Sequence, residues 1–138
     1  MSNTIHPPTQ VSFQTERFPP FSEKEEQVTP GRFGKRLAGF VCKWLEQHDI
    51  KVKNCYPEVW GWQVEIHHPP FPIRIGCGNV EGTRANNHFL MIIEPDRAFI
   101  RRFPWVKRTH TSMDVARVQQ LLHKMLTELD GISHIVWH

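Results

Sequence analysis

The 138-residue chain has few cysteines, little net charge and no long apolar run, and each shortage excludes a class of protein. Its three cysteines, Cys42, Cys55 and Cys77, are irregularly spaced without a C-x-x-C pair, which excludes a disulfide scaffold or zinc finger. The formal net charge is only +3, below the basic excess typical of nucleic-acid proteins. No run reaches the ~18 apolar residues of a membrane helix, and the first ten residues do not resemble a secretory signal. We therefore expect a cytoplasmic protein with reduced cysteines and no membrane contact.

Recognisable catalytic and metal-binding motifs are also missing. Neighbours on a strand point to opposite faces, so His67 and His68 cannot chelate one ion together. There is no G-x-S-x-G motif, and nothing favours a pairing of Cys77 with His88. The candidate acid–base carboxylates are scattered: Glu58, Glu65, Glu81, Glu94 and Asp96. We expect no metal, no cofactor and no enzymatic activity.

A first helix is expected over residues 30–48, with Thr29 as its cap and Pro30 at its first position. Its apolar residues recur at helical spacing: Phe33, Leu37, Phe40, Val41, Trp44 and Leu45. Its opposite face carries Arg32, Lys35, Arg36, Lys43 and Glu46. Gly34 and Gly39 each weaken a helix by about 1 kcal/mol, or else allow a strand to pack closely.

Alternating apolar residues predict strands after this helix, at 51–56, 60–67, 71–77 and 89–94, with a short edge strand at 98–103. The first turn is placed at Pro57-Glu58, and the strand 89–94 is expected to be central. A second helix, 112–130, is expected to start at Thr111 and to end before Gly131, which suits a left-handed cap. Residues 132–137 then form a last strand or tail.

These elements predict an α+β fold: an antiparallel sheet of four to six strands with two helices packed on one face. Residues 29–138 form this single domain, and residues 1–28 form an extended arm rich in Pro and Phe. Phe13, Phe18 and Phe21 are expected to lie down on the domain. The alternative for Phe18 to Phe21 is a partner's groove.

The main charge feature is a basic segment between Asp96 and Asp114, interleaved with aromatic residues. It contains Arg97, Arg101, Arg102, Lys107 and Arg108 together with Phe99, Phe103 and Trp105. Such a segment suits a solvated edge strand, an anchor for a protein partner or, less well, a site for nucleic acid. A second feature is Trp60-Gly61-Trp62, whose indoles would share one strand face. They would form either core or a binding platform, with Gly61 leaving the other face bare.

Three segments carry a resemblance to a family: 33–45, 57–62 (Pro-Glu-Val-Trp-Gly-Trp) and 73–76 (Ile-Arg-Ile-Gly). Over roughly residues 18–137 the chain resembles small bacterial proteins with a Pro-Glu-Asp-Trp-Gly-Trp motif, similar to immunity proteins of secreted polymorphic toxins. Val59 stands where that group prefers Asp, so any role of that carboxylate is absent.

The resemblance implies a non-catalytic protein that binds a cognate toxin directly. The expected partner-binding residues are Trp60, Trp62, Arg97, Arg101, Arg102, Trp105, Lys107 and Arg108. Two alternatives stay open, namely a nucleic-acid or phosphate-binding module using Arg97–Arg108 and a small enzyme without a recognisable motif. The oligomeric state is left open.

Overall fold

The computed structural model describes residues 8–19, 31–67, 73–80, 87–95 and 108–138, with the backbone alone for 108–113. Within these ranges the chain forms six strands and two helices. In order they are β1 (Gln10–Thr15), α2 (Lys35–Gln47), β2 (Val52–Glu58), β3 (Gly61–Ile66), β4 (Ile73–Asn79), β5 (His88–Pro95), α4 (Arg108–Glu128) and β6 (Ile132–Trp137).

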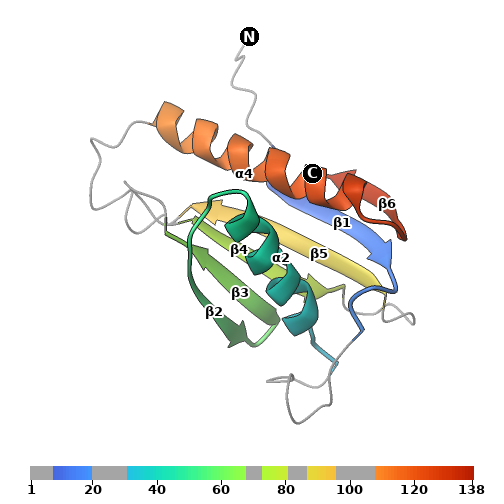
Figure 1. The fold of residues 1–138 in the computed structure, drawn as a ribbon. Coiled ribbons are helices and arrows are strands. Elements are labelled where there is room, and N and C mark those ends of the chain that lie inside the picture. The colour runs from blue at the N-terminus through green and yellow to red at the C-terminus, as the bar shows by residue number, and fades with distance from the viewer. Residues whose placement is uncertain (1–7, 20–30, 68–72, 81–86, 96–107) are drawn as a thin grey trace.

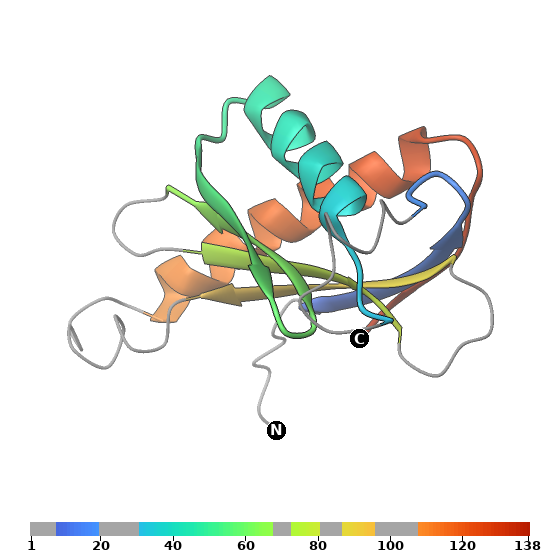
Figure 2. The same ribbon diagram turned by 90° about the horizontal axis from the view of Figure 1, so that it is seen from below.

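The strands form one sheet in the order β2-β3-β4-β5-β1-β6, and every neighbouring pair is antiparallel. Helix α2 lies across β2, β3 and β4, and α4 lies across β5 and β6. Both helices cover the same face, as the two views show (Figure 1, Figure 2). The predicted α+β fold, with an antiparallel sheet and two helices on one face, is confirmed.

The core lies between the helices and the covered face of the sheet. Along β5, Phe89, Met91 and Ile93 are buried in alternation with partly or fully exposed neighbours. Phe89 is the centre of an aromatic cluster, with the rings of Phe13 and Phe18 at 5.9 and 6.0 Å and that of Phe33 at 5.8 Å. The prediction that 89–94 is a central strand is confirmed, because β5 has paired strands on both sides.

Strand β1 comes from the segment that the sequence assigned to the extended arm. Phe13 is fully buried and Phe18 nearly so, as expected for an arm that lies down on the domain. The segment is also a structural strand, since β1 pairs with β5 on one side and with β6 on the other. Phe21 lies outside the described residues.

Helix α2 begins at Lys35, five residues later than expected. Asn79 at the end of β4 holds the preceding backbone extended: Asn79 Oδ1 accepts from Phe33 N–H at 3.0 Å, and Asn79 N–H donates to Phe33 O at 3.0 Å. Gly34 is the N-cap, where a Cβ atom would overlap the Cys77 carbonyl oxygen. The tertiary contact therefore decides where the helix starts, and Thr29 and Pro30 lie outside the described residues.

Two other boundaries differ from the prediction. The first turn is at Val59-Trp60, because β2 runs through Pro57 to Glu58. Proline is tolerated there because β2 is an edge strand, where a missing N–H costs no ladder bond. Helix α4 begins at Arg108, so Thr111 lies inside its first turn and is not its cap. The expected edge strand 98–103 lies outside the described residues.

The far end of α4 agrees with the sequence. The helix ends at Glu128, and Gly131 in the following turn has a φ of 79°, the left-handed conformation predicted for it. Residues 132–137 form β6. No helix among the described residues is long and apolar enough to cross a membrane.

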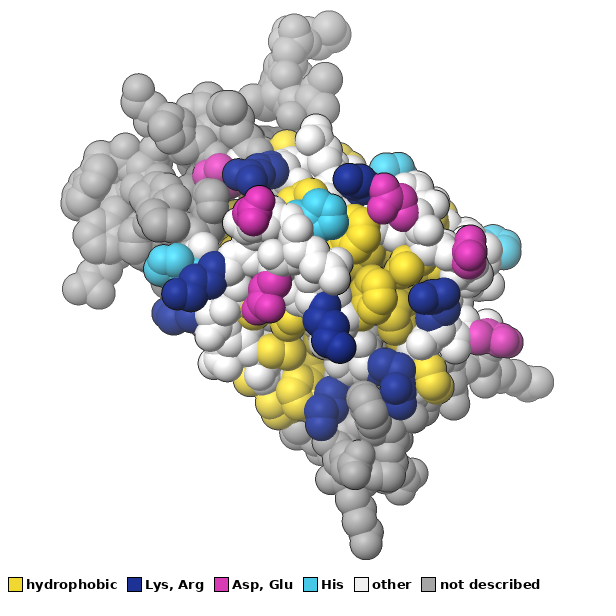
Figure 3. Space-filling view, in the orientation of Figure 1, with side chains coloured by type: hydrophobic (Ala, Val, Ile, Leu, Met, Phe, Trp, Pro, Cys, Tyr) yellow, Lys and Arg dark blue, Asp and Glu magenta, His cyan; other side chains and the backbone are white. Residues whose placement is uncertain are grey.

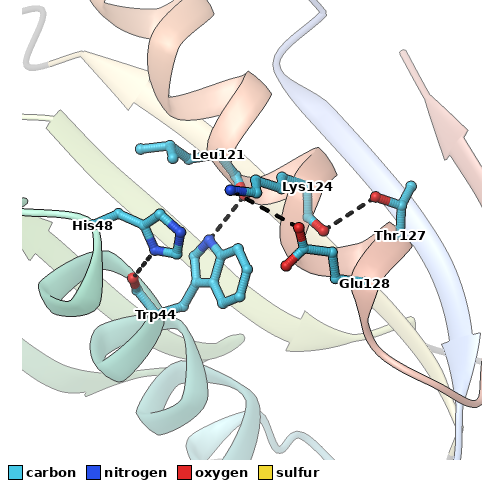
Figure 4. Close-up of polar contacts among 6 residues, drawn as sticks. All are labelled: Trp44, His48, Leu121, Lys124, Thr127 and Glu128. Carbon is cyan, nitrogen blue, oxygen red and sulfur yellow. Dashed lines mark hydrogen bonds and ion pairs between the residues drawn. The ribbon is translucent and has the colours of Figure 1, made fainter.

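The two helices are tied by Trp44, whose indole Nε1–H donates to the Leu121 carbonyl oxygen at 2.9 Å (Figure 4). The His48 ring lies against the Trp44 ring with centroids 4.3 Å apart, and its Nδ1 is 2.8 Å from Trp44 O. This polar bond fixes the end of α2 against the middle of α4.

Candidate functional site

Most of the predicted partner-binding residues lie in the segment that the structure does not describe. Arg97, Arg101, Arg102, Trp105 and Lys107 are all outside the described residues. Arg108 is the first residue of α4, with its backbone alone described.

Trp60 and Trp62 do not share a face, and that prediction is wrong. Trp60 lies in the β2–β3 turn, and its ring crosses Gly76 on the face of the sheet opposite the helices. Trp62 lies in β3 on the helix side, where the Lys35 ammonium is 5.5 Å from its ring centroid. The alternation fails because Gly61 between them has a φ of 156°, a conformation that other residues rarely adopt.

Gly61 does not leave room for a ligand. A Cβ atom at this position would overlap the Cys77 carbonyl oxygen and lie 3.0 Å from Gly78 Cα. The close approach that the glycine allows is therefore to the neighbouring strand β4 of the same sheet.

A groove runs along α2 on the helix-bearing face, with a volume of about 730 Å³. It is lined by residues of the chain after β1, of α2, of β2 and of β3: Arg17, Phe18, Lys35, Arg36, Gly39, Phe40, Lys43, Cys55 and Trp62. Four of these side chains are cationic and three are aromatic, and none of the described lining residues is acidic. On this face, Lys and Arg side chains lie beside hydrophobic ones, and Asp and Glu side chains are also present (Figure 3).

Contacts to the backbone position two of the cations. Arg36 Nε–H donates to Pro19 O at 3.0 Å, and Arg17 Nη1–H donates to Asp130 O at 3.2 Å. Both side chains belong to exposed residues, as does Lys43. The guanidinium groups are therefore oriented while they keep contact with solvent, which suits attraction of a negatively charged ligand.

The aromatic part of the groove is held more rigidly. The Phe18 and Phe40 rings lie 5.6 Å apart at a tilt of 58°. The Trp62 Nε1 atom is buried and has no hydrogen-bond partner among the described residues. Gly39 adds no side chain, and a Cβ atom there would meet nothing within 4 Å. Its absent side chain thus widens the groove and does not admit a strand, unlike the close contact at Gly34.

Cys55 lines this groove, Cys42 is partly buried in α2, and Cys77 is fully buried in β4. Burial raises the pKa of Cys77, and a thiol hydrogen bond to Cys55 together with burial raises the pKa of Cys42. The pKa of Cys55 is lowered, because the Cys42 S–H donates to it and the Lys35 ammonium attracts its charge, both opposing its burial. The Cys77 side chain cannot pair with His88: Cys77 opposes Met91 on the covered face, and His88 alternates to the other face.

The opposite face of the sheet carries a smaller hollow of about 200 Å³, lined by Trp60, Gln63, Arg74, Gly76, Ile92 and Glu94. Arg74 Nε is 3.6 Å from Glu65 Oε1, and Glu94 is the partner of Arg74 in the β4–β5 register. Glu58 is on the edge strand β2. Within the described part of the chain, no group of three or more His, Cys, Asp or Glu residues could hold a metal ion.

Sequence reasoning missed the groove. The cationic face of α2 was visible in the spacing of Lys35, Arg36 and Lys43. That Arg17 and Phe18 close the groove from the other side depends on where β1 lies in the sheet. Comparisons with family models, curated proteins and solved structures found no match to this chain.

Proposed function

We propose that this protein is a non-catalytic binding protein and that the groove along α2 holds an acidic segment of a partner protein. The observation that carries the proposal is the composition of the groove. Arg17, Lys35, Arg36 and Lys43 surround three aromatic rings, with no carboxylate among the described lining residues. Aromatic and Arg side chains are the residues most enriched at interface hot spots, and complementary charge speeds association.

The proposed partner is a cognate bacterial toxin, which would make this chain an immunity protein. Support for that step comes from the sequence resemblance, whose motif includes the groove residue Trp62. The proposal does not require contacts from Trp60, on the opposite face, or from the basic segment Arg97–Arg108. The groove replaces Trp60 as the centre of the proposed surface because it gathers four cationic side chains and three aromatic rings.

The test is calorimetric titration of the purified protein with any toxin that is found encoded beside its gene. We expect Arg17→Glu and Lys43→Glu each to weaken binding about tenfold, equivalent to about 1.4 kcal/mol, and the loss to shrink at high salt. Lys53→Glu makes the same charge change at an exposed residue of β2 that does not line the groove, and it should bind like the wild type.

Three outcomes would contradict the proposal at different points. Equal binding by all charge variants would place the surface elsewhere. A neighbouring toxin that does not bind would refute the immunity role. Sub-micromolar binding of a single-stranded RNA at ~150 mM salt, lost in Lys43→Glu, would assign the groove to nucleic acid, since non-specific affinity at such salt is weaker.

A further inference from the structure

A glycine creates a hollow on the open face of the sheet. Gln63, Gly76 and Ile92 are register partners across β3, β4 and β5, and all three line this hollow. Because Gly76 has no side chain, a gap remains between the side chains of Gln63 and Ile92. Trp60 closes one end of the gap, since the atoms nearest to a Cβ built on Gly76 are Cη2 and Cζ3 of its ring, at 2.8 and 3.1 Å. The result is a hollow of about 200 Å³.

The Trp60 ring meets the sheet with its edge. Both of the ring atoms nearest to Gly76 belong to the outer edge of the six-membered ring, and the next nearest atom is Gln63 Oε1 at 3.7 Å. The flat faces of the indole therefore stand upright on the sheet, and Trp60 is 37% exposed. An aromatic face carries partial negative charge and attracts a cation that is placed over it.

The Gln63 amide offers a hydrogen-bond acceptor inside the hollow. Gln63 is only 9% exposed, and its Oε1 is the atom that lies 3.7 Å from the Cβ position of Gly76. No group in the described part of the chain forms a hydrogen bond with this side-chain amide. A largely buried amide without a partner costs free energy, so a ligand that donates a hydrogen bond to Oε1 is favoured there.

The hollow also contains a carboxylate whose charge is not balanced by an ion pair. Glu94 lines the hollow, is exposed and forms no ion pair with the described residues. Its register partner Arg74 lies beside Glu65 instead, with Arg74 Nε 3.6 Å from Glu65 Oε1. These three charges sum to one negative charge. A carboxylate, an amide oxygen and an aromatic ring together suit a cation with several N–H donors.

We propose that this hollow binds the guanidinium group of an arginine side chain from a partner protein. The planar guanidinium stacks on the Trp60 ring, and its fork of N–H groups donates to Gln63 Oε1 and to the Glu94 carboxylate. Pockets for whole small molecules have volumes from about 300 Å³ upwards, so this smaller hollow suits a single side chain. The hollow is on the opposite face from the groove along α2, so this proposal does not depend on the function proposed for the groove.

The test is an NMR titration of the isotope-labelled full chain with acetyl-arginine methylamide. The matched control is acetyl-citrulline methylamide, which has the same shape but an uncharged urea group in place of the guanidinium. We expect the indole N–H resonance of Trp60 and the side-chain amide resonances of Gln63 to shift saturably with the arginine compound and to move little with the citrulline compound. Methylguanidinium, the same cation without the stem, should give the same shifts at higher concentration.

Two substitutions of one kind locate the site. Glu94→Gln keeps the shape of the side chain and removes its charge, and we expect it to weaken binding of the arginine compound about fivefold, because hydrogen bonds to charged groups are stronger. Glu46→Gln makes the same change at an exposed residue of α2, on the helix-bearing face, and should bind like the wild type. Trp60→Leu should abolish the saturable shift of Gln63, with circular dichroism confirming an intact fold.

Four results would overturn the proposal. The first is the absence of any saturable shift of Trp60 with the arginine compound. The second is equal binding of the arginine and citrulline compounds, and the third is equal binding by Glu94→Gln and the wild type. The fourth is tighter binding of methylguanidinium than of the arginine compound, because the hollow would then take a free small cation and not a side chain.

Discussion

The two faces of the sheet differ in what they bury and in how they arrange charge. Phe89 and Met91 of β5 point under the helices and are fully buried, whereas Leu90 and Ile92 between them remain partly exposed on the other face. Alternate residues of one strand therefore lie in the buried and in the partly exposed environment. Period-2 alternation in the sequence thus predicts which face of a strand will be covered, but it does not predict which element covers it.

The two faces also differ in how their charged side chains are arranged. On the open face, Arg74 is flanked in register by Glu65 and Glu94, so positive and negative charges lie side by side. On the helix-bearing face, the groove along α2 gathers four cationic side chains, and none of its described lining residues is acidic. Cross-strand pairing balances charge locally, while a groove between elements can concentrate one sign. A binding role fits the second arrangement better than the first.

We expect the largest difference in stability between the two faces from a substitution of Phe89. Phe89→Ala removes the ring that contacts Phe13, Phe18 and Phe33, and we expect a loss of about 3–5 kcal/mol in the free energy of unfolding. Leu90→Ala on the opposite face should cost about 1 kcal/mol, since that side chain is only partly buried. Urea denaturation measures both. Equal losses would mean that the open face is covered in solution.

Substitutions of two glycines test the same difference between the helix-covered side and the open face of the sheet. Gly34→Ala places a methyl group against the rigid Cys77 carbonyl, and we expect a loss of about 1–3 kcal/mol. Gly76→Ala on the open face meets the end of the Trp60 ring at 2.8 Å, which can swing away, so the loss should be below about 1 kcal/mol.

The ring movement has its own readout. The indole N–H resonance of Trp60, assigned with Trp60→Phe, should shift in Gly76→Ala while that of Trp62 stays. A large loss of stability without a Trp60 shift would show that the ring is fixed against the sheet.

A further prediction concerns the bond between the helices. Trp44→Phe removes the indole N–H that donates to Leu121 O, which should cost about 1 kcal/mol of unfolding free energy. Trp60→Phe makes the same chemical change on the open face and should change stability by a few tenths of that. Thermal unfolding in parallel compares them, and indistinguishable variants would assign no stabilising role to the interhelical bond.

Much of the fold could be predicted because it depends on local patterns. The stripe Leu37, Val41 and Leu45 is fully buried, and the strands follow the alternation. The predicted boundaries were wrong where tertiary structure decides the beginning or end of an element. Asn79 delays the start of α2, and the edge position of β2 allows the strand to continue through Pro57.

The candidate site was harder to predict. Partner-binding was assigned to Trp60 and Trp62 as one platform, yet Gly61 turns them to opposite faces. The groove could not be read from the spacing of its lining residues, because α2, β2 and β3 must first pack together.

The sequence by itself determined the class of fold, the helical stripe and the buried positions of the strands, because periodicity depends only on bonds between neighbours along the chain. Tertiary structure alone decided that β1 lies between β5 and β6, and that Arg17 and Phe18 thereby meet the cationic face of α2. These contacts join residues far apart in sequence. They contribute to stability only after the sheet has brought those residues together.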